Sequence, residues 1–130
     1  MDKPKYPVYI ISKGRADVGY TANFMLKDKI DFKLVIEPQE FKEYARFYDE
    51  KLLMVTPFSN LGKGSIPVRN FIWEDSIKNG HERHWCFDDN IHSIRYSWNG
   101  RRIKCNGNLG IHAVEKFTDR YENIAISGMN

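Results

Sequence analysis

Hydrophobic residues gather in four short runs along the first ninety positions of the chain, at 6–11, 32–38, 51–57 and 83–89. These runs are rich in β-branched and aromatic residues, which is typical of strands. Their apolar positions are nearly continuous rather than alternating, as in strands that are covered on both faces of a parallel sheet. The pattern therefore predicts four mainly parallel strands.

Helical spacing of apolar residues lies between these runs. The segment 65–80 begins with Ser65 as an N-cap, carries Pro67 in its first turn and ends at Gly80. Two more helices are predicted, one just before the third run and one, with a weaker pattern, over 16–29. Two apolar faces are expected to point inward: Phe41, Tyr44, Ala45 and Tyr48 in one helix, and Val68, Phe71, Ile72 and Ile77 in the other. Strands alternating with helices predict an α/β fold with right-handed crossovers.

The pattern changes after the fourth run. In 94–105, Asn99-Gly100 lies between two strand-like arms, which indicates a β-hairpin with a type I′ turn. The segment 108–123 has helical spacing, and 124–128 resembles one more short strand. The inward face of that helix is expected to consist of Ile111, Val114, Phe117 and Tyr121.

Length and composition are those of one globular domain covering residues 1–130. The net charge of +3 is too small to establish a nucleic-acid partner by itself. Cys86 and Cys105 fit no metal-binding spacing, so we expect reduced thiols in the cytoplasm. No signal peptide is evident, and no apolar run approaches the roughly 18 residues of a membrane span, so no membrane partner is expected.

Polar clusters follow each of the four predicted strands. Ser12-Lys13-Gly14-Arg15 follows the first, Glu37 ends the second, the segment 59–64 follows the third, and Asp88-Asp89-Asn90 ends the fourth. In open α/β sheets, ligands bind at the carboxyl ends of the strands, near the point where strand order reverses. The four clusters therefore predict one binding site.

The third cluster is glycine-rich and directly precedes a predicted helix. Gly62 and Gly64 would let backbone N–H groups approach an anion, and Asn60, Lys63 and the nearby Arg69 would add polar and cationic contacts. The loop is not a P-loop, because the GxxxxGK[ST] pattern is absent. A flexible connector and a surface arginine are the plain alternatives.

The acidic triplet Asp88-Asp89-Asn90 suits a divalent cation. Mg²⁺ and Mn²⁺ prefer hard oxygen ligands and keep several positions for water and phosphate, so one or two carboxylates suffice. A turn is the simpler interpretation of the same residues. With an anion-binding loop on the preceding strand, the triplet predicts a metal–diphosphate site.

Four segments together resemble the TET-associated glycosyltransferases, a mainly bacteriophage-encoded family related to the glycosyltransferase domain of the GREB-type proteins. They are "PVYIISKGRA", "VIEPQEFKEY", "SNLGKGSIPVRNFIWEDS" and "HWCFDDNI". The resemblance implies a Rossmann-like GT-A fold that binds a nucleotide-sugar, for which UDP-sugar is expected, together with Mn²⁺ or Mg²⁺. It implies a chain in the host cytoplasm and hydroxymethylated pyrimidines of phage DNA as acceptor.

The resemblance also implies roles for matching positions. Ser12, Lys13 and Arg15 would line the nucleotide pocket, and Glu37 would meet the base or ribose. The 59–64 loop and Arg69 would lie near the diphosphate and sugar. The acidic triplet (Asp88, Asp89 and Asn90) stands in the DXD-like place, with Asn as a neutral third ligand.

The acceptor half of the enzyme is the part least represented. GT-A enzymes usually carry the acceptor site, and often the catalytic base, beyond the DXD-bearing half, and this sequence ends at Asn130. A minimal enzyme, one lobe of a larger product and a binding-competent remnant are the three interpretations, and no catalytic base is assigned.

Two other functions remain open alternatives. A nucleotidyltransferase would also need glycines, a basic residue and a carboxylate-bound metal, but it usually has its glycine-rich loop after the first strand. A non-catalytic nucleotide- or DNA-binding module is favoured by the predicted hairpin, where cations and aromatic residues suit base stacking: Arg95, Tyr96, Trp98, Arg101, Arg102 and Lys104. An exposed hairpin without a partner is the plain alternative.

Overall fold

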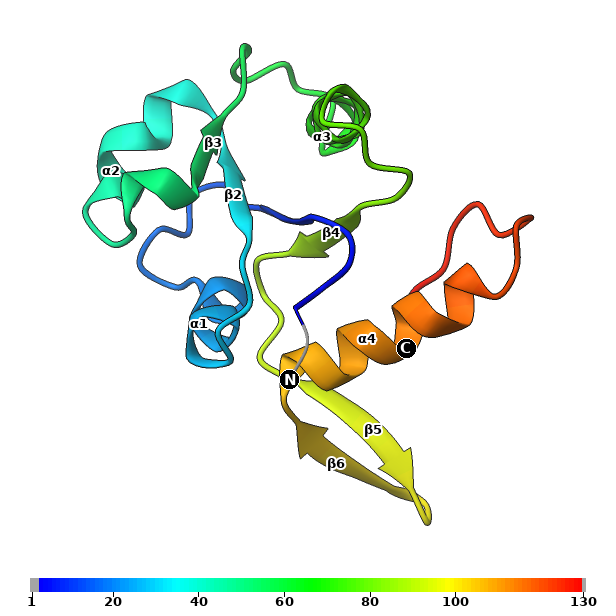
Figure 1. Ribbon diagram of the computed structural model, residues 1–130. Helices are drawn as coiled ribbons and strands as arrows, with labels where there is room; N and C mark the ends of the chain where they lie inside the picture. Colours follow the sequence, from blue (N-terminus) through cyan, green and yellow to red (C-terminus); the bar gives the residue numbers. More distant parts are fainter. Residues whose placement is uncertain (1–2, 130) are drawn as a thin grey trace.

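The computed structural model describes residues 3–129 and contains a four-stranded parallel sheet in the order β3-β2-β1-β4 (Figure 1). The predicted parallel α/β sheet is confirmed, with each strand shorter than its apolar run. The strands are β1 (Val8–Ile11), β2 (Lys33–Ile36), β3 (Leu53–Val55) and β4 (Trp85–Asp88).

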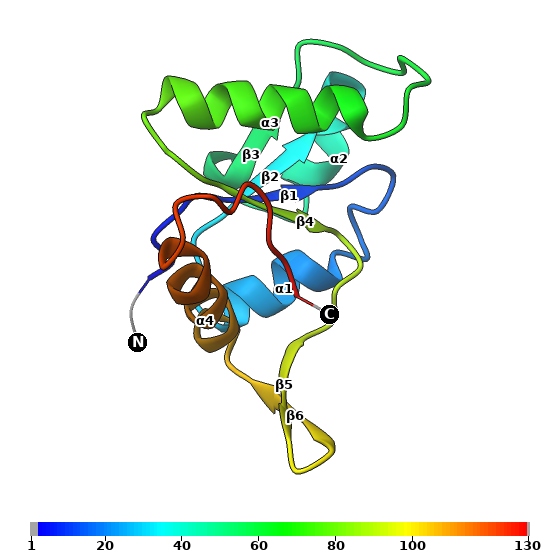
Figure 2. The ribbon, with the colours of Figure 1, turned by 90° about the vertical axis from the view of Figure 1, so that its right-hand side faces the viewer.

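Helices cover both faces of this sheet. They are α1 (Tyr20–Lys27), α2 (Phe41–Ala45), α3 (Ile66–Lys78) and α4 (Gly107–Asp119), with short 3₁₀ turns at Pro38–Glu40 and Glu50–Leu52. Figure 2 shows α3 on one side of the sheet and α1 and α4 on the other. The chain steps outward from β1 to β2 and β3, and α3 then returns it to the opposite side of β1. The strand order therefore reverses between β1 and β4.

The two central strands explain the continuous apolar runs. In β1, Val8 and Ile10 pack with the helices α1, α2 and α4, whereas Tyr9 packs against α3 on the other face. In β2, Leu34 and Val35 divide between the faces in the same way. Since both faces are covered, three successive residues of each strand are buried, at 8–10 in β1 and 34–36 in β2.

The apolar face expected for α3 is correct except at its end. Val68 and Ile72 are buried and Phe71 is partly buried, but Ile77 is 56% exposed and Ser76 lies inward instead. The buried positions of the helix are spaced four residues apart, so Ser76 is the next residue to face the sheet after Ile72. The adjacent Ile77 therefore points toward solvent.

The inward face expected for α4 is partly wrong. Ile111 is buried, but Phe117 and Tyr121 are 51% and 48% exposed, and Glu115 and Thr118 are buried in their place. Glu115 accepts backbone hydrogen bonds from Lys5 and Tyr6, at 3.0 Å each, and another from the Trp85 indole, also at 3.0 Å. A buried carboxylate with three donors is well satisfied, and it fixes the rotation of the helix.

The remaining strands, β5 (Ile94–Trp98) and β6 (Arg101–Cys105), form an antiparallel hairpin that projects away from the sheet (Figure 1). At its tip, Asn99 and Gly100 have φ values of 48° and 73°, the left-handed conformations that a type I′ turn requires.

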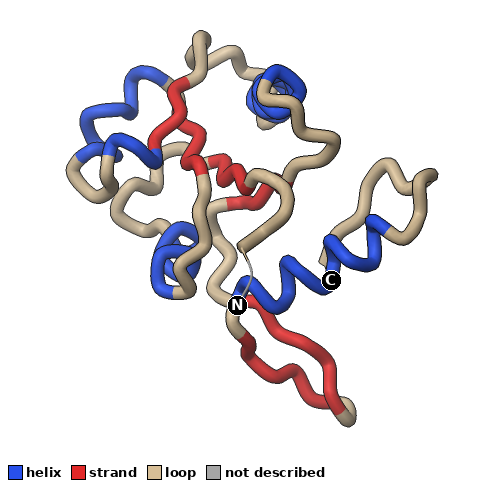
Figure 3. The backbone as a smooth tube through the Cα atoms, in the orientation of Figure 1, coloured by secondary structure: helices blue, strands red, loops and turns tan. Residues whose placement is uncertain are grey.

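The strand predicted over 124–128 is wrong, because the structure has no regular element there (Figure 3). Side chains hold this segment instead: Arg83 donates to the Ile124 carbonyl at 2.8 Å, and the Ser127 and Thr118 hydroxyls lie 2.6 Å apart. Within the described residues, no helix has both the length and the apolar character needed to cross a membrane.

Candidate functional site

The loop after β1 and the acidic turn after β4 meet at the carboxyl edge of the sheet. Ile11 is in register with Asp88, so the residues that follow each strand emerge side by side. Ser12 donates a hydrogen bond from Oγ to Asp89 Oδ2 at 2.9 Å, and Arg15 pairs with Asp89 Oδ1 at 3.3 Å. The structure thus brings together three of the predicted site residues where strand order reverses.

A second group of contacts joins β2 to the glycine-rich loop. Glu37 pairs with Lys13 at 3.2 Å, and its Oε1 accepts the backbone N–H of Asn60 at 2.7 Å. Gln39 donates to the same oxygen at 2.9 Å, and Lys13 also donates to the Asn60 side chain at 3.1 Å. These donors, Gln39 first and then the Asn60 N–H, hold the pKa of the Glu37 carboxyl below its usual range despite its burial.

Arg69 completes the edge from the first turns of α3. Its guanidinium lies 3.7 Å from Asp88 Oδ1, and its Nε donates to Ser65 Oγ at 3.2 Å. Ser65 occupies the N-cap position as predicted, but its side chain caps no helix N–H. The Asp88 side chain is 68% exposed, whereas that of Asp89 is 14% exposed. The two adjacent carboxylates therefore have different environments.

Thr21 holds the acidic turn in place and was not identified from the sequence. Its hydroxyl donates to the Asp88 carbonyl and accepts the Ile91 N–H at 2.9 Å, and its own N–H donates to the Asp89 carbonyl at 3.3 Å. It is fully buried. The sequence offered no signal for this role, because the groups that the Thr21 hydroxyl bonds lie 67 and 70 positions further along the chain.

Tyr44 also belongs to the site, although the sequence assigned it only to the core. Its hydroxyl bonds the Ser12 hydroxyl and accepts the backbone N–H of Arg15 at 3.2 Å. Burial raises the pKa of this phenol, so it stays protonated and can act as donor. It therefore fixes the loop that carries Ser12.

The glycines of the third cluster are required by backbone conformation. Gly62 and Gly64 have φ values of +69° and +62°, and a Cβ on either would meet nothing within 4 Å. Asn60 also has a positive φ, of 50°. Lys63 is exposed, and no ion pair or hydrogen bond between described residues involves it. The loop therefore stands open next to the edge, and Asn60 ties its beginning to Glu37 and Lys13.

Asn90 is exposed and lies in the same turn as Asp88 and Asp89. Two residues further along the chain, the ring of His92 stacks on the ring of Tyr20, with 3.9 Å between the ring centroids.

The charges along this edge are closely balanced. Lys13 faces Glu37, Arg15 faces Asp89, and Arg69 faces Asp88. A diphosphate arriving there would meet little uncompensated positive charge beyond Lys63. Binding of such an anion would therefore be favoured by an additional cation.

The carboxylates of Asp88 and Asp89 suit a metal ion whose remaining ligands are water and phosphate oxygens. Within the described residues, no group of three His, Cys, Asp or Glu side chains forms a complete protein-only metal site. Asp88 is largely exposed, and Asp89 is partly engaged by Ser12 and Arg15. Mg²⁺ typically takes one or two carboxylates plus water and phosphate oxygens, which agrees with this donor set.

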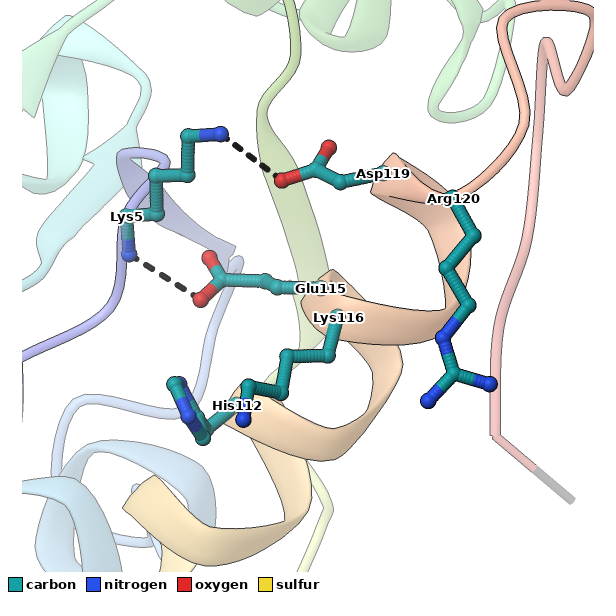
Figure 4. A pocket seen from close by; sticks show the side chains of 6 residues that line it. All are labelled: Lys5, His112, Glu115, Lys116, Asp119 and Arg120. Carbon is teal, nitrogen blue, oxygen red and sulfur yellow. Dashed lines mark hydrogen bonds and ion pairs between the residues drawn. The ribbon is translucent and has the colours of Figure 1, made fainter.

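A separate small hollow lies near the amino end of β1, away from this edge. It has a volume of about 230 Å³ and is lined by Lys5, by residues of α4 and by Arg120 directly after that helix (Figure 4). Its acids are already engaged, because Lys5 pairs with Asp119 at 2.8 Å and Glu115 accepts backbone N–H groups. The carboxyl edge is therefore the better candidate site.

The hairpin residues predicted to contact an acceptor are not part of the edge. Arg95, Trp98, Arg101 and Arg102 are all exposed on β5 and β6, which extend beyond α1 and α4 (Figure 2). The structure thus separates these residues from the polar network.

One comparison with known proteins identifies a family. The sequence model of the family described as TET-Associated Glycosyltransferase matches residues 6–130, nearly the whole chain. No curated protein and no solved structure matches the chain.

Proposed function

Because the chain belongs to the TET-associated glycosyltransferase family, we propose that it transfers a sugar from a nucleotide-diphosphate sugar to a nucleic-acid acceptor. UDP-sugar is the proposed donor, and hydroxymethylated pyrimidines in phage DNA are the proposed acceptor. The fold is proposed to be of the GT-A type, acting in the cytoplasm of the host.

The polar network at the carboxyl edge carries this proposal. The loops after β1 and β4 meet where strand order reverses, which is where open α/β sheets bind nucleotides, and the ends of β2 and β3 continue the same edge. Ser12 and Arg15 stand beside Asp89 on one side of this point, and Lys13 stands beside Glu37 on the other. We assign the nucleotide to the loop after β1 and to the Glu37 region.

Glu37 has a positioning role in this assignment. Its carboxylate already accepts hydrogen bonds from Asn60, Gln39 and Lys13. It therefore shapes the pocket by holding the loop after β3 against the end of β2, and the exposed Lys13 and Asn60 present the polar groups to the ligand.

The diphosphate is assigned to the space between the 60–64 loop and the acidic turn. Gly62 and Gly64 keep side chains out of the approach, Lys63 supplies an exposed positive charge, and Arg69 offers a planar set of donors. Arg69 would exchange its long 3.7 Å contact with Asp88 for phosphate oxygens.

Mn²⁺ or Mg²⁺ is assigned to Asp88, Asp89 and Asn90. The balanced charges of the edge support this assignment, since the incoming diphosphate needs a counter-charge. When bound, the metal would neutralise the charge that develops on the leaving diphosphate. Thr21 keeps the backbone of the turn fixed, so that its carboxylates do not have to be ordered on binding.

A screen of nucleotide-sugars tests the proposal, with and without Mn²⁺. A ligand bound only to the folded state adds about 2.7 kcal/mol of stability at 100 times its Kd. We expect one nucleotide-sugar to raise the melting temperature with Mn²⁺ present, and to be consumed when a hydroxymethylated oligonucleotide is added.

Asp88→Asn is the matched variant for that screen, and Asp31→Asn is its control. Both carboxylates are largely exposed and pair with one basic side chain, but only Asp88 lies at the edge. Loss of stabilisation in both variants, or in neither, would contradict the assigned site. Stabilisation without sugar transfer would indicate a non-catalytic binding module.

A further inference from the structure

The hairpin of β5 and β6 separates aromatic and cationic side chains onto opposite faces. Directly paired residues of an antiparallel ladder point to the same side, and successive residues alternate. The pairs Ile94–Cys105, Tyr96–Ile103 and Trp98–Arg101 therefore share one face, and Arg95–Lys104 and Ser97–Arg102 share the other. One face is aromatic and apolar with an arginine at its tip, and the other is cationic.

The positive charge of this region is not compensated. Residues 91–114 contain four of the chain's 20 Lys and Arg and none of its 17 Asp and Glu, so 16 basic and 17 acidic residues remain elsewhere. The formal net charge of +3 therefore originates in this segment. Among the described residues, no ion pair involves the four basic residues, namely Arg95, Arg101, Arg102 and Lys104.

The hairpin is anchored at its base and open at its tip. Ile94 is buried and packs so closely on α4 that a Cβ added at Gly110 would lie 2.4 Å from its Cγ2. Toward the tip, Tyr96 is 45% and Trp98 62% exposed. The aromatic rings are thus presented to solvent on a fixed support.

From these observations we infer that the hairpin binds an unpaired, single-stranded stretch of nucleic acid. Bases stack on Tyr96 and Trp98, and the four basic residues Arg95, Arg101, Arg102 and Lys104 contact phosphates. Stacking on an aromatic side chain contributes about 1–3 kcal/mol per base, but it requires a base face that a duplex already covers. Nucleic acid is the ligand that offers both flat rings and regularly repeated negative charge.

The inference rests on the proposed nucleic-acid acceptor. It adds which surface of the protein binds that acceptor and that the bound acceptor is single-stranded. It makes the hairpin the element that recruits the acceptor, separate from the edge to which the donor is assigned. Consequently, substitutions on the hairpin should leave nucleotide-diphosphate binding intact.

Fluorescence anisotropy over a salt series tests this, with a short labelled oligonucleotide as single strand and as duplex. Four phosphate contacts on a single strand predict that log K falls against log salt with a slope of about −2.8. Replacing Arg95, Arg102 and Lys104 by Ala should flatten this slope by about 2. The control replaces the exposed Lys42, Lys78 and Lys116 by Ala, and should leave the slope unchanged.

Trp98→Ala tests the aromatic face. It should weaken single-strand binding about 5- to 150-fold, the fold-change that corresponds to one lost stacking contact, while leaving the salt slope in place. Trp73→Ala is the matched control, since this indole is 58% exposed on α3, which lies on the opposite side of the sheet from the hairpin (Figure 2).

Three results would overturn the inference: no binding to the single strand at low salt, equal losses on single strand and duplex in Trp98→Ala, or a change of oligomeric state in that variant without a change in oligonucleotide binding. Calorimetric binding of UDP with Mn²⁺ is measured on the same proteins. If neither the wild-type chain nor any variant binds UDP, the result would count against the proposed donor site and not against the hairpin.

Discussion

The carboxyl edge of the sheet and the β5–β6 hairpin are both rich in basic residues, but they use them differently. At the edge, Lys13, Arg15 and Arg69 each face a carboxylate. On the hairpin, the basic residues point to solvent, and acidic residues are absent from the whole 91–114 segment. Paired charges hold a site in shape, whereas unpaired charges attract an external anion over longer distances.

The supports of the two regions differ as well. The edge is built on the ends of four strands and is fixed from behind by the buried Thr21 and Tyr44. Within the described part of the chain, the hairpin is supported at its base alone, where Ile94 packs on α4 at Gly110 and Cys105 packs against the core. Substitutions at buried positions of the edge should therefore affect both stability and binding, whereas substitutions toward the hairpin tip should affect binding alone.

Thr21→Val should produce the largest loss of stability. The substitution keeps the shape of the side chain but leaves the Asp88 carbonyl and the Ile91 N–H without their partner. Two unsatisfied buried groups should lower the free energy of unfolding by about 2–4 kcal/mol, measured by urea denaturation. Donor binding should fall with it, because the acidic turn is released.

Thr21→Ser is the control for this substitution, since it retains the hydroxyl. It should recover most of the binding. An unchanged free energy of unfolding in Thr21→Val would show that the carboxyl edge, like the hairpin tip, does not depend on buried hydrogen bonds.

The neighbouring carboxylates Asp88 and Asp89 should respond differently to replacement by Asn. Asp89 is mostly buried and accepts from Ser12 and Arg15, so Asp89→Asn should cost about 1–3 kcal/mol of stability. Asp88 is exposed, and Asp88→Asn should change stability by less than about 0.5 kcal/mol. Thermal and urea unfolding measure both, and similar losses at the two positions would contradict the distinction.

The glycines of the open loop allow a comparison of strain with binding. Gly62→Ala, Gly64→Ala and the control Gly80→Ala all place a side chain at positive φ with open space around it. Each should cost about 1–2 kcal/mol of stability. Only the two loop variants should also weaken diphosphate binding relative to nucleoside binding in calorimetric titrations. If both affinities fall together, the loop has only a structural role.

Glu37→Gln should have a modest effect on stability that shows itself as a change in pH dependence. The pKa of Glu37 is lowered in the folded state, so its ionised form stabilises the fold above the unfolded pKa of about 4.3 and this contribution is lost as pH falls through the folded pKa. The variant should lose about 1–2 kcal/mol at neutral pH and show a flatter decline in acid. Urea denaturation at several pH values measures this, and parallel curves would count against the Glu37 contacts.

The apolar pattern was sufficient to predict the sheet and its order of elements. Continuous runs identified β1 and β2, because both faces of these strands are covered. The same reasoning located the carboxyl-end clusters, since parallel strands all end at one edge. The family resemblance was also confirmed, by the match over residues 6–130.

Features that depend on tertiary hydrogen bonds were not predictable in this way. Glu115 occupies a core position of α4 because three donors converge on it, and no helical spacing reveals such donors. Thr21 and Tyr44 support the site through residues more than twenty positions away. The segment 124–128 has the composition of a strand, but it is held by Thr118 and Arg83 instead of by a neighbouring strand.

The central claim is that the carboxyl edge binds a nucleotide diphosphate together with a divalent cation. Calorimetric titration of UDP into the wild-type chain, with Mn²⁺ and then with excess chelator, tests it most directly. The balanced charges of the edge predict at least about a tenfold loss of affinity without the metal, a difference of roughly 1.4 kcal/mol, and a similar loss in Asp88→Asn. Equal affinity in the two conditions would contradict the claim.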